Sequence, residues 1–121
     1  MLRDKELTYR IRGCIFEVFQ QLGHGFAEKV YENSLMTEFT LQGLHAKNQV
    51  LLPVNYKGNN VGDYYADIIV EDSIVLELKA QPALSRVHET QLLNYLKAGK
   101  YTVGLLINFT YPKAEIKRLV L

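Results

Sequence analysis

The chain has 121 residues, a length that suits one domain, so residues 1–121 are expected to fold as a single unit. Hydrophobic residues make up 48% and charged residues 22% of the sequence, as is typical of a soluble globular protein. No apolar run approaches the roughly 20 residues needed to cross a bilayer, which excludes a membrane-spanning helix.

The formal net charge is +1, which neither supports nor excludes a nucleic-acid partner, because non-specific binders usually gather basic side chains on one face. The N-terminal stretch MLRDKELTYR is charged and lacks the apolar core of a signal peptide, so a cytoplasmic location is expected. The single cysteine, Cys14, lies on the apolar side of a predicted helix, where an inert buried thiol is expected.

Three helices are predicted from apolar residues that recur at gaps of three and four. They cover about residues 5–22, 27–42 and 84–98. The sequence also places residues of the expected type at their ends. These are the GHG stretch at 23–25, Gly43 and Gly99 after the helices, and Ser85 as an N-cap of the third.

Five strands are predicted in the remaining segments, which change to a strand-like pattern. They cover residues 46–56, 63–70, 73–80, 101–109 and 116–121. Pro53 indicates an edge strand or a bulge, and KGNN at 57–60 predicts a turn. Short connections make the first three strands an antiparallel meander, and the third helix is long enough for a crossover to a parallel fourth strand. The expected fold class is therefore α/β, a mixed sheet flanked by helices.

Charged side chains interrupt two of these strands, in the stretch YYADIIVEDSIVLELKA at 64–80. Asp67, Glu77 and Lys79 stand where Val or Ile would pack better, and charges in a half-buried strand cost free energy unless they are paired. Glu77 and Lys79 are two residues apart, so they share a face of their strand. A structural salt-bridge cluster on a solvated face is one explanation, since Glu-x-Lys is common in exposed strands.

The length of the turn between these strands decides where Asp67 lies. If Glu71, Asp72 and Ser73 form the turn, Val70 pairs with Ile74 and Asp67 lies directly across from Glu77, with Cβ atoms about 5 Å apart. A two-residue turn would instead put Asp67 opposite Leu78. Two opposed carboxylates repel each other unless one is protonated or a cation binds between them. Hard oxygen ligands of this kind suit Mg²⁺ or Mn²⁺.

At this point the sequence resembles a known superfamily. Asp67 followed by Glu77-Leu78-Lys79 is similar to the D…(D/E)-x-K signature of the PD-(D/E)xK nucleases, with Ala66 in place of the eponymous proline. The resemblance continues through HETQLLNYL and GLLINF and covers most of the chain. It implies a restriction-endonuclease-like α-β-β-β-α-β core with an extra N-terminal helix and a C-terminal strand.

The segment GFAEKVY is Gly25-x-x-Glu28-x-x-Tyr31, which matches the motif of the GxxExxY protein family, a small-domain branch of that superfamily. Glu28 falls in the first turn of a helix, where the helix dipole favours a carboxylate. The resemblance implies a second role for Glu28, as a further carboxylate for the metal. Tyr31 shares its helix face with Glu28 and is expected to be a packing aromatic residue.

Polar residues His88, Gln91 and Tyr95 form a stripe on the third predicted helix. Gln91-x-x-x-Tyr95 resembles a helix motif that some nucleases of the superfamily place beside the metal. The resemblance implies that the Gln91 amide touches Lys79 or a metal-bound water, and that Tyr95 contacts the nucleic-acid backbone. Alternatively, both residues cap the sheet and meet solvent. For His88 a surface or capping role is expected.

The resemblance implies metal-dependent hydrolysis of a phosphodiester in nucleic acid, DNA more often than RNA. Asp67 and Glu77 would hold Mg²⁺ or Mn²⁺, with the Leu78 carbonyl as an additional ligand, and Lys79 would orient the attacking water and offset developing charge. A competing hypothesis is a catalytically silent binding or accessory module that keeps the fold. Because the chain is small, a homodimer would enlarge the surface that grips substrate.

Overall fold

The computed structural model describes residues 4–121, and residues 1–3 of the charged N-terminal stretch lie outside the described part. Its elements are, in chain order, α1 Asp4–Leu22, α2 Glu28–Leu41, β1 Ala46–Tyr56, β2 Asn59–Val70, β3 Ile74–Lys79, α3 Arg86–Gly99, β4 Val103–Asn108 and β5 Glu115–Val120. The predicted element order is confirmed. Within residues 4–121, none of the helices is both long and apolar enough to span a membrane.

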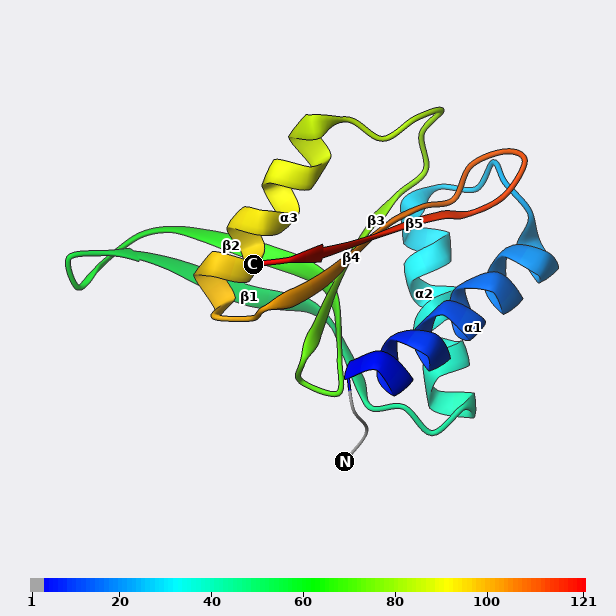
Figure 1. Ribbon diagram of the computed structural model, residues 1–121, viewed down its shortest axis with the longest axis horizontal. Helices are drawn as coiled ribbons and strands as arrows, with labels where there is room; N and C mark the ends of the chain where they lie inside the picture. The colour runs from blue at the N-terminus through cyan, green and yellow to red at the C-terminus, as the bar shows by residue number, and fades with distance from the viewer. Residues whose placement is uncertain (1–3) are drawn as a thin grey trace.

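The start of β2 differs most from its predicted position. A turn was expected over 57–60 and a strand from 63, but β2 begins at Asn59. The turn needs only Lys57 and Gly58, both with positive φ, so strand pairing resumes at once with Tyr56 opposite Asn59. The result is a long β1–β2 hairpin that reaches well beyond the rest of the sheet (Figure 1).

The five strands form one sheet in the order β1-β2-β3-β4-β5. β1, β2 and β3 are an antiparallel meander, β3 and β4 are parallel, and β5 runs antiparallel to β4, so the predicted mixed sheet is confirmed. Both explanations for Pro53 hold, because β1 is an edge strand and its register shifts between Val54 and Asn55.

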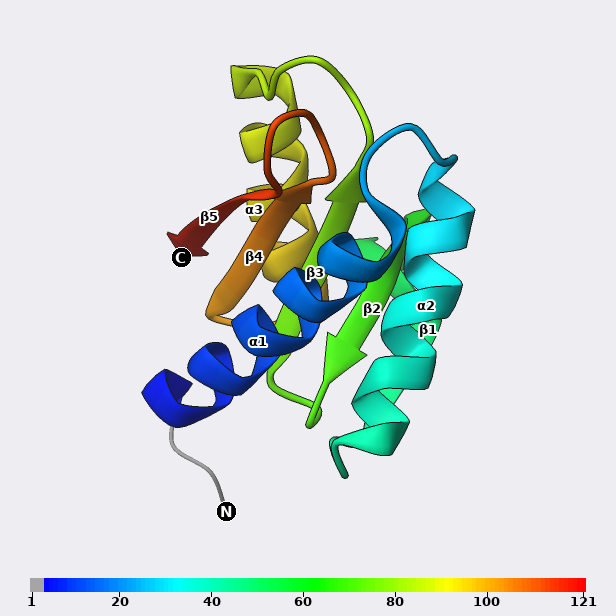
Figure 2. The same cartoon turned by 90° about the vertical axis from the view of Figure 1, so that its right-hand side faces the viewer.

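Helices cover both faces of the sheet. α1 and α2 lie on one face and α3 on the other (Figures 1 and 2). Each side has its own hydrophobic core, the larger one under α1 and α2 and the smaller one under α3. Cys14 lies in the larger core, where burial raises the pKa of its thiol to about 11, as expected for an inert thiol.

Two glycines allow close packing around α3. Gly104 of β4 lies beneath Leu92, and a Cβ at position 104 would be 2.9 Å from a Leu92 methyl carbon. Gly99, expected to stop the helix, is instead its last residue, and a Cβ there would be 2.7 Å from the Tyr101 ring. Lys100 takes the left-handed C-cap conformation, with φ 60°.

Gly104→Ala is expected to destabilise the fold by roughly 1–3 kcal/mol, because Leu92 would have to move out of a packed core. The free energy of unfolding, measured by urea denaturation, tests this. Gly13→Ala is the matched control: a Cβ at position 13 of α1 meets nothing within 4 Å. Because alanine favours a helix over glycine, the control should gain roughly 0.5–1 kcal/mol. Equal effects at the two positions would contradict the packing role of Gly104.

Candidate active site

The turn between β2 and β3 has the length that brings the predicted carboxylates together. Val70 pairs with Ile74, which leaves Glu71, Asp72 and Ser73 between them. Glu71 and Asp72 have φ of 51° and 52°, and the Ser73 N–H donates to the Val70 carbonyl at 3.1 Å. Of the two turn lengths considered, the three-residue turn is therefore the one that forms, and the backbone pairing that it sets runs from Val70–Ile74 to Ile68–Leu76.

Ile68 and Leu76 form the last backbone pair between β2 and β3. Beyond this pair, side-chain carboxyl groups accept the backbone hydrogen bonds that join the two strands. The Asp67 N–H donates to Oε1 of Glu77 at 3.1 Å, and the Leu78 N–H donates to Oδ2 of Asp67 at 2.8 Å. Each carboxyl group thus accepts a backbone hydrogen bond from the opposite strand. The two bonds hold the carboxyl groups next to each other.

The regular alternation of side chains along β2 is interrupted at Asp67. Ile68 and Val70 lie in the larger core, and strict alternation would put Ala66 there too. Ala66 lies instead in the smaller core under α3. Asp67 therefore lies at the point where the side chains of β2 switch from one face of the sheet to the other.

β1 is irregular at the same level. Asn48 pairs with Ile68 and Val50 pairs with Ala66, so Gln49 lies between these pairs and opposite Asp67. Gln49 has φ of 51°, a left-handed conformation within a strand, and its amide donates to Oδ1 of Asp67 at 3.5 Å. The distortion aims a side-chain amide at the carboxyl group.

Burial and crowding of negative charge raise the pKa of both carboxyl groups. Glu77 is 3% exposed, and its burial, followed by the neighbouring charge of Asp67, raises its pKa to about 8. The pKa of Asp67 is raised by burial and then by the charges of Glu32 and Glu28. Without a bound cation, Glu77 therefore keeps its proton at neutral pH, which relieves the repulsion between the two groups.

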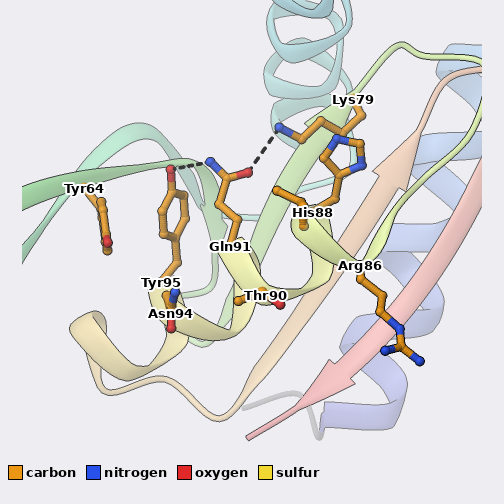
Figure 3. Close-up of a pocket in the computed structure, with 9 residues that line it drawn as sticks. Tyr64, Lys79, Arg86, His88, Thr90, Gln91, Asn94 and Tyr95 are labelled. Atoms are coloured by element: carbon orange, nitrogen blue, oxygen red, sulfur yellow. Dashed lines mark hydrogen bonds between the residues drawn. The ribbon is translucent and has the colours of Figure 1, made fainter.

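Lys79 lies on the α3 side of β3 and is held by the helix. Its Nζ donates to Oε1 of Gln91 at 3.2 Å, and Nε2 of Gln91 donates to the Tyr95 hydroxyl at 3.2 Å (Figure 3). Burial, and next the charge of Glu77, raise the pKa of Tyr95, so its hydroxyl stays protonated. The expected contact between Gln91 and Lys79 is present in the structure.

A groove of about 660 Å³ runs along α3 beside this chain of hydrogen bonds. Lys79 and Arg86 supply its positive charge, and Tyr64 of β2 faces Tyr95 with ring centroids 5.0 Å apart (Figure 3). His88 also lines the groove and has the expected capping role, because its Nδ1 accepts a hydrogen bond from the Ser85 N–H at 3.1 Å. Residues of the groove thus include cations and aromatic rings but no carboxylate.

Tyr31 is a packing residue, as expected. It is fully buried and stacks on Phe109 with ring centroids 4.1 Å apart. Its hydroxyl donates to the Gly23 carbonyl at 2.6 Å and accepts the Phe26 N–H at 3.3 Å. Tyr31 therefore fixes the loop that leads into α2 and to Glu28.

Glu28 is the first residue of α2 and is exposed to solvent. Its charge contributes to the raised pKa of Asp67 and of Glu77, which puts it on their side of the molecule. Within residues 4–121, however, no three His, Cys, Asp or Glu side chains are grouped closely enough to hold a metal ion. The structure thus brings Asp67 and Glu77 together and leaves Glu28 outside the pair.

Glu32 and its partners are the part of the site that sequence reasoning missed. Glu32 is 4% exposed and accepts hydrogen bonds from Lys29 at 2.9 Å, Asn48 at 3.0 Å and Gln49 at 2.9 Å. Burial alone would raise its pKa, but these three donors outweigh burial and lower it. Its position one helical turn after Glu28 was the available signal. Glu32 ties α2 to the irregular part of β1 and so holds Gln49 against Asp67.

The donor set fits a hard divalent cation. Mg²⁺ often binds proteins through only one or two carboxylates and keeps waters or phosphate oxygens in its other positions. Asp67 and Glu77 provide two such groups, and burial followed by neighbouring negative charge raises the pKa of both. The set is too small for a closed structural metal site but leaves positions open for a substrate.

Comparisons with known proteins agree with this geometry. A family model described as the PD-(D/E)XK nuclease superfamily matches residues 5–119, and the chain therefore belongs to that superfamily. No curated protein matches the chain significantly, whereas four chains of solved structures do. One is the crystal structure of SSO0001, with a TM-score of 0.63 and 21% identity over 77% of this chain. The match spans 50% of the SSO0001 chain and supports the restriction-endonuclease-like fold.

Glu77 is expected to make the stability of the metal-free protein depend on pH. Its pKa rises from 4.5 to about 8 on folding, so the folded chain binds more protons than the unfolded chain between these values. The free energy of unfolding should therefore fall as pH rises from 4.5 to 8, by on the order of 2–5 kcal/mol. Glu77→Gln should lose most of this fall, whereas Glu6→Gln on the exposed side of α1 should keep it. Urea denaturation in EDTA across this pH range gives the answer, and an unchanged slope in Glu77→Gln would contradict the assignment.

Glu32→Ala is expected to lower the free energy of unfolding by roughly 2–4 kcal/mol, because three donors lose a buried charged acceptor. Glu28→Ala, in the same helix but exposed, should cost less than about 1 kcal/mol through the helix dipole. Thermal or urea denaturation of both variants compares them directly. Similar losses would show that the Glu32 hydrogen bonds contribute little.

Proposed function

We propose that the chain is a metal-dependent nuclease in which Asp67 and Glu77 bind Mg²⁺ or Mn²⁺ and Lys79 assists hydrolysis of a phosphodiester. The main support is the pair of carboxyl groups joined by two strand-to-strand hydrogen bonds, with the Lys79 side chain on the same face as Glu77. Membership of the nuclease superfamily supports a nucleic-acid substrate. We infer that this substrate is DNA, because nucleases of this kind act on DNA more often than on RNA.

The carboxylates of Asp67 and Glu77 would hold the cation, with the Leu78 carbonyl as an additional ligand and Glu28 acting through an intervening water. When bound, a divalent cation supplies Lewis-acid chemistry that lowers the pKa of water and polarises a phosphate oxygen. Glu77 must release its proton for the cation to bind, because its pKa is raised to about 8 without one. Binding should therefore tighten as pH rises toward 8.

Lys79 has the task of offsetting charge that develops on the phosphate and of orienting the attacking water. Gln91 accepts one hydrogen bond from the Lys79 ammonium, which leaves its other protons free for substrate. Tyr95 positions Gln91, and the Tyr95 ring lines the groove in which the nucleic-acid backbone would lie. Tyr95 thus orients Gln91, and Gln91 orients Lys79.

We also infer that the chain belongs to the GxxExxY branch. Gly25 has φ of 103°, a conformation that favours glycine, and Tyr31 anchors the same loop through its hydroxyl. Glu28 then starts α2 on the side of the carboxylate pair. In this motif, Gly25 and Tyr31 would shape the loop, and Glu28 would lie toward the proposed metal.

Metal-dependent cleavage of DNA is the expected activity, and it should fall at least about 100-fold in two variants. Asp67→Asn removes a charged ligand of the proposed cation, and Lys79→Gln removes the positive charge beside the reacting phosphate. Cleavage of labelled single-stranded and duplex DNA in Mg²⁺ or Mn²⁺ measures this. Asp63→Asn and Lys5→Gln, at exposed positions, are the matched controls and should cleave like the wild type.

Calorimetric titration with Mn²⁺ separates binding from turnover. Wild type and Lys79→Gln should bind the ion, and Asp67→Asn should not. Equal cleavage by all variants would point to a contaminant or another site. A folded wild type that binds no Mn²⁺ would favour the catalytically silent module instead.

A further inference from the structure

A second hollow lies beside the proposed active site. It measures about 410 Å³, and its lining residues come from the loops α1–α2, β3–α3 and β4–β5 and their ends. These three loops lie at one end of the sheet (Figure 2). Aromatic rings of His24, Phe26, Phe109 and Tyr111 line it. Neither a carboxylate nor a Lys or Arg side chain is among its lining residues, so it suits a flat, uncharged ring rather than a phosphate.

The aromatic lining is held in place by the core. Phe109 is 1% exposed and stacks on Tyr31, while Phe26 meets the edge of Tyr31 with ring centroids 6.1 Å apart. Tyr111 is 72% exposed and contacts His24 at 5.1 Å between ring centroids, at an interplanar angle of 64°. Most of the Tyr111 ring is therefore available to a ligand.

A buried asparagine holds the β3–α3 loop, which forms one side of the hollow. Asn108 is fully buried, accepts the Gln81 N–H at 2.9 Å and donates to the Gln81 carbonyl at 2.8 Å. The Phe109 N–H also donates to the Lys79 carbonyl at 2.8 Å. Gln81 and Thr110 are among the lining residues, so these hydrogen bonds form this part of the hollow before any ligand arrives.

The hollow and the groove along α3 lie on either side of the end of β3. Lys79 lines the groove, and the next residue, Ala80, lines the hollow and packs against the larger core on the opposite face. Because Ala80 directly follows Lys79, a polynucleotide that passes around the end of β3 with a phosphate at Lys79 would place a neighbouring nucleotide at the hollow.

We propose that this hollow binds an unpaired base of the nucleic-acid substrate next to the cleaved phosphate, with Tyr111 as the stacking surface. The proposal rests on the proposed function and extends it to the substrate class. A base inside a duplex is paired and stacked on its neighbours, so it cannot enter the hollow without being extruded. Aromatic platforms beside a basic groove are typical of single-strand binding. The substrate is therefore single-stranded, or unpaired at this position.

Binding without turnover tests the proposal. The dissociation constant of a labelled single strand of about 12 nucleotides, and of its duplex, is measured by fluorescence anisotropy in EDTA. The wild type should prefer the single strand. Tyr111→Ala should weaken single-strand binding roughly fivefold to a hundredfold, because one stacked base contributes about 1–3 kcal/mol, and should leave duplex binding unchanged. Tyr111→Phe should bind like the wild type.

Tyr9→Ala is the matched control, since Tyr9 is 78% exposed on α1, and it should change nothing. Wild-type affinity in Tyr111→Ala, an equal loss in Tyr9→Ala, or a preference of the wild type for duplex would overturn the proposal. If Mn²⁺-dependent cleavage persists in that case, the nuclease proposal stands alone. If Tyr111-dependent single-strand binding occurs without any cleavage, the base site stands and the nuclease proposal fails.

Discussion

The burial of two carboxyl groups between β2 and β3 is the constraint on which the site depends. Asp67 and Glu77 accept backbone hydrogen bonds from each other's strands, and these bonds take over where the regular ladder ends at Ile68 and Leu76. Such burial is unfavourable for charge, as the raised pKa values show. In the folded chain, a proton or a cation is therefore needed to offset the negative charge of the pair.

The irregular strand geometry around Asp67 follows from the same arrangement. β2 changes face there, and Gln49 adopts a left-handed conformation directly opposite. Glu32 then supports Gln49 from α2. Strain of this kind persists only where surrounding contacts over-determine it, and it clusters at functional sites. Here the contacts come from a helix that also carries Glu28 toward the carboxylate pair.

The α3 side of β3 shows how rigid packing supports a chain of hydrogen-bonded polar side chains. Gly104 lets Leu92 of α3 settle close to β4, which brings the neighbouring Gln91 within reach of Lys79. On the other side of the strand end, Tyr31 and Asn108 hold the loops around the aromatic hollow. The flexible lysine therefore lies between two preformed surfaces, and little ordering is left to be done when a substrate binds.

The local signals in the sequence were sufficient for much of this protein. Periodicity placed the helices and strands, and the spacing of Glu77 and Lys79 put them on one face. These features depend on neighbours in the chain, so they can be inferred from it. The length of the turn between β2 and β3 stayed open in the sequence, and the structure decided it in favour of the three residues EDS.

Only the tertiary structure decided what depends on distant segments. The local sequence does not reveal that Glu32 is a buried acceptor, because its donors Asn48 and Gln49 come from β1. The hollow beside Lys79 needs loops from three separate parts of the chain, and the exposed position of Glu28 depends on how α2 lies against the sheet. Burial, charge crowding and hydrogen-bond partners are properties of neighbours in space, which periodicity along the chain does not encode.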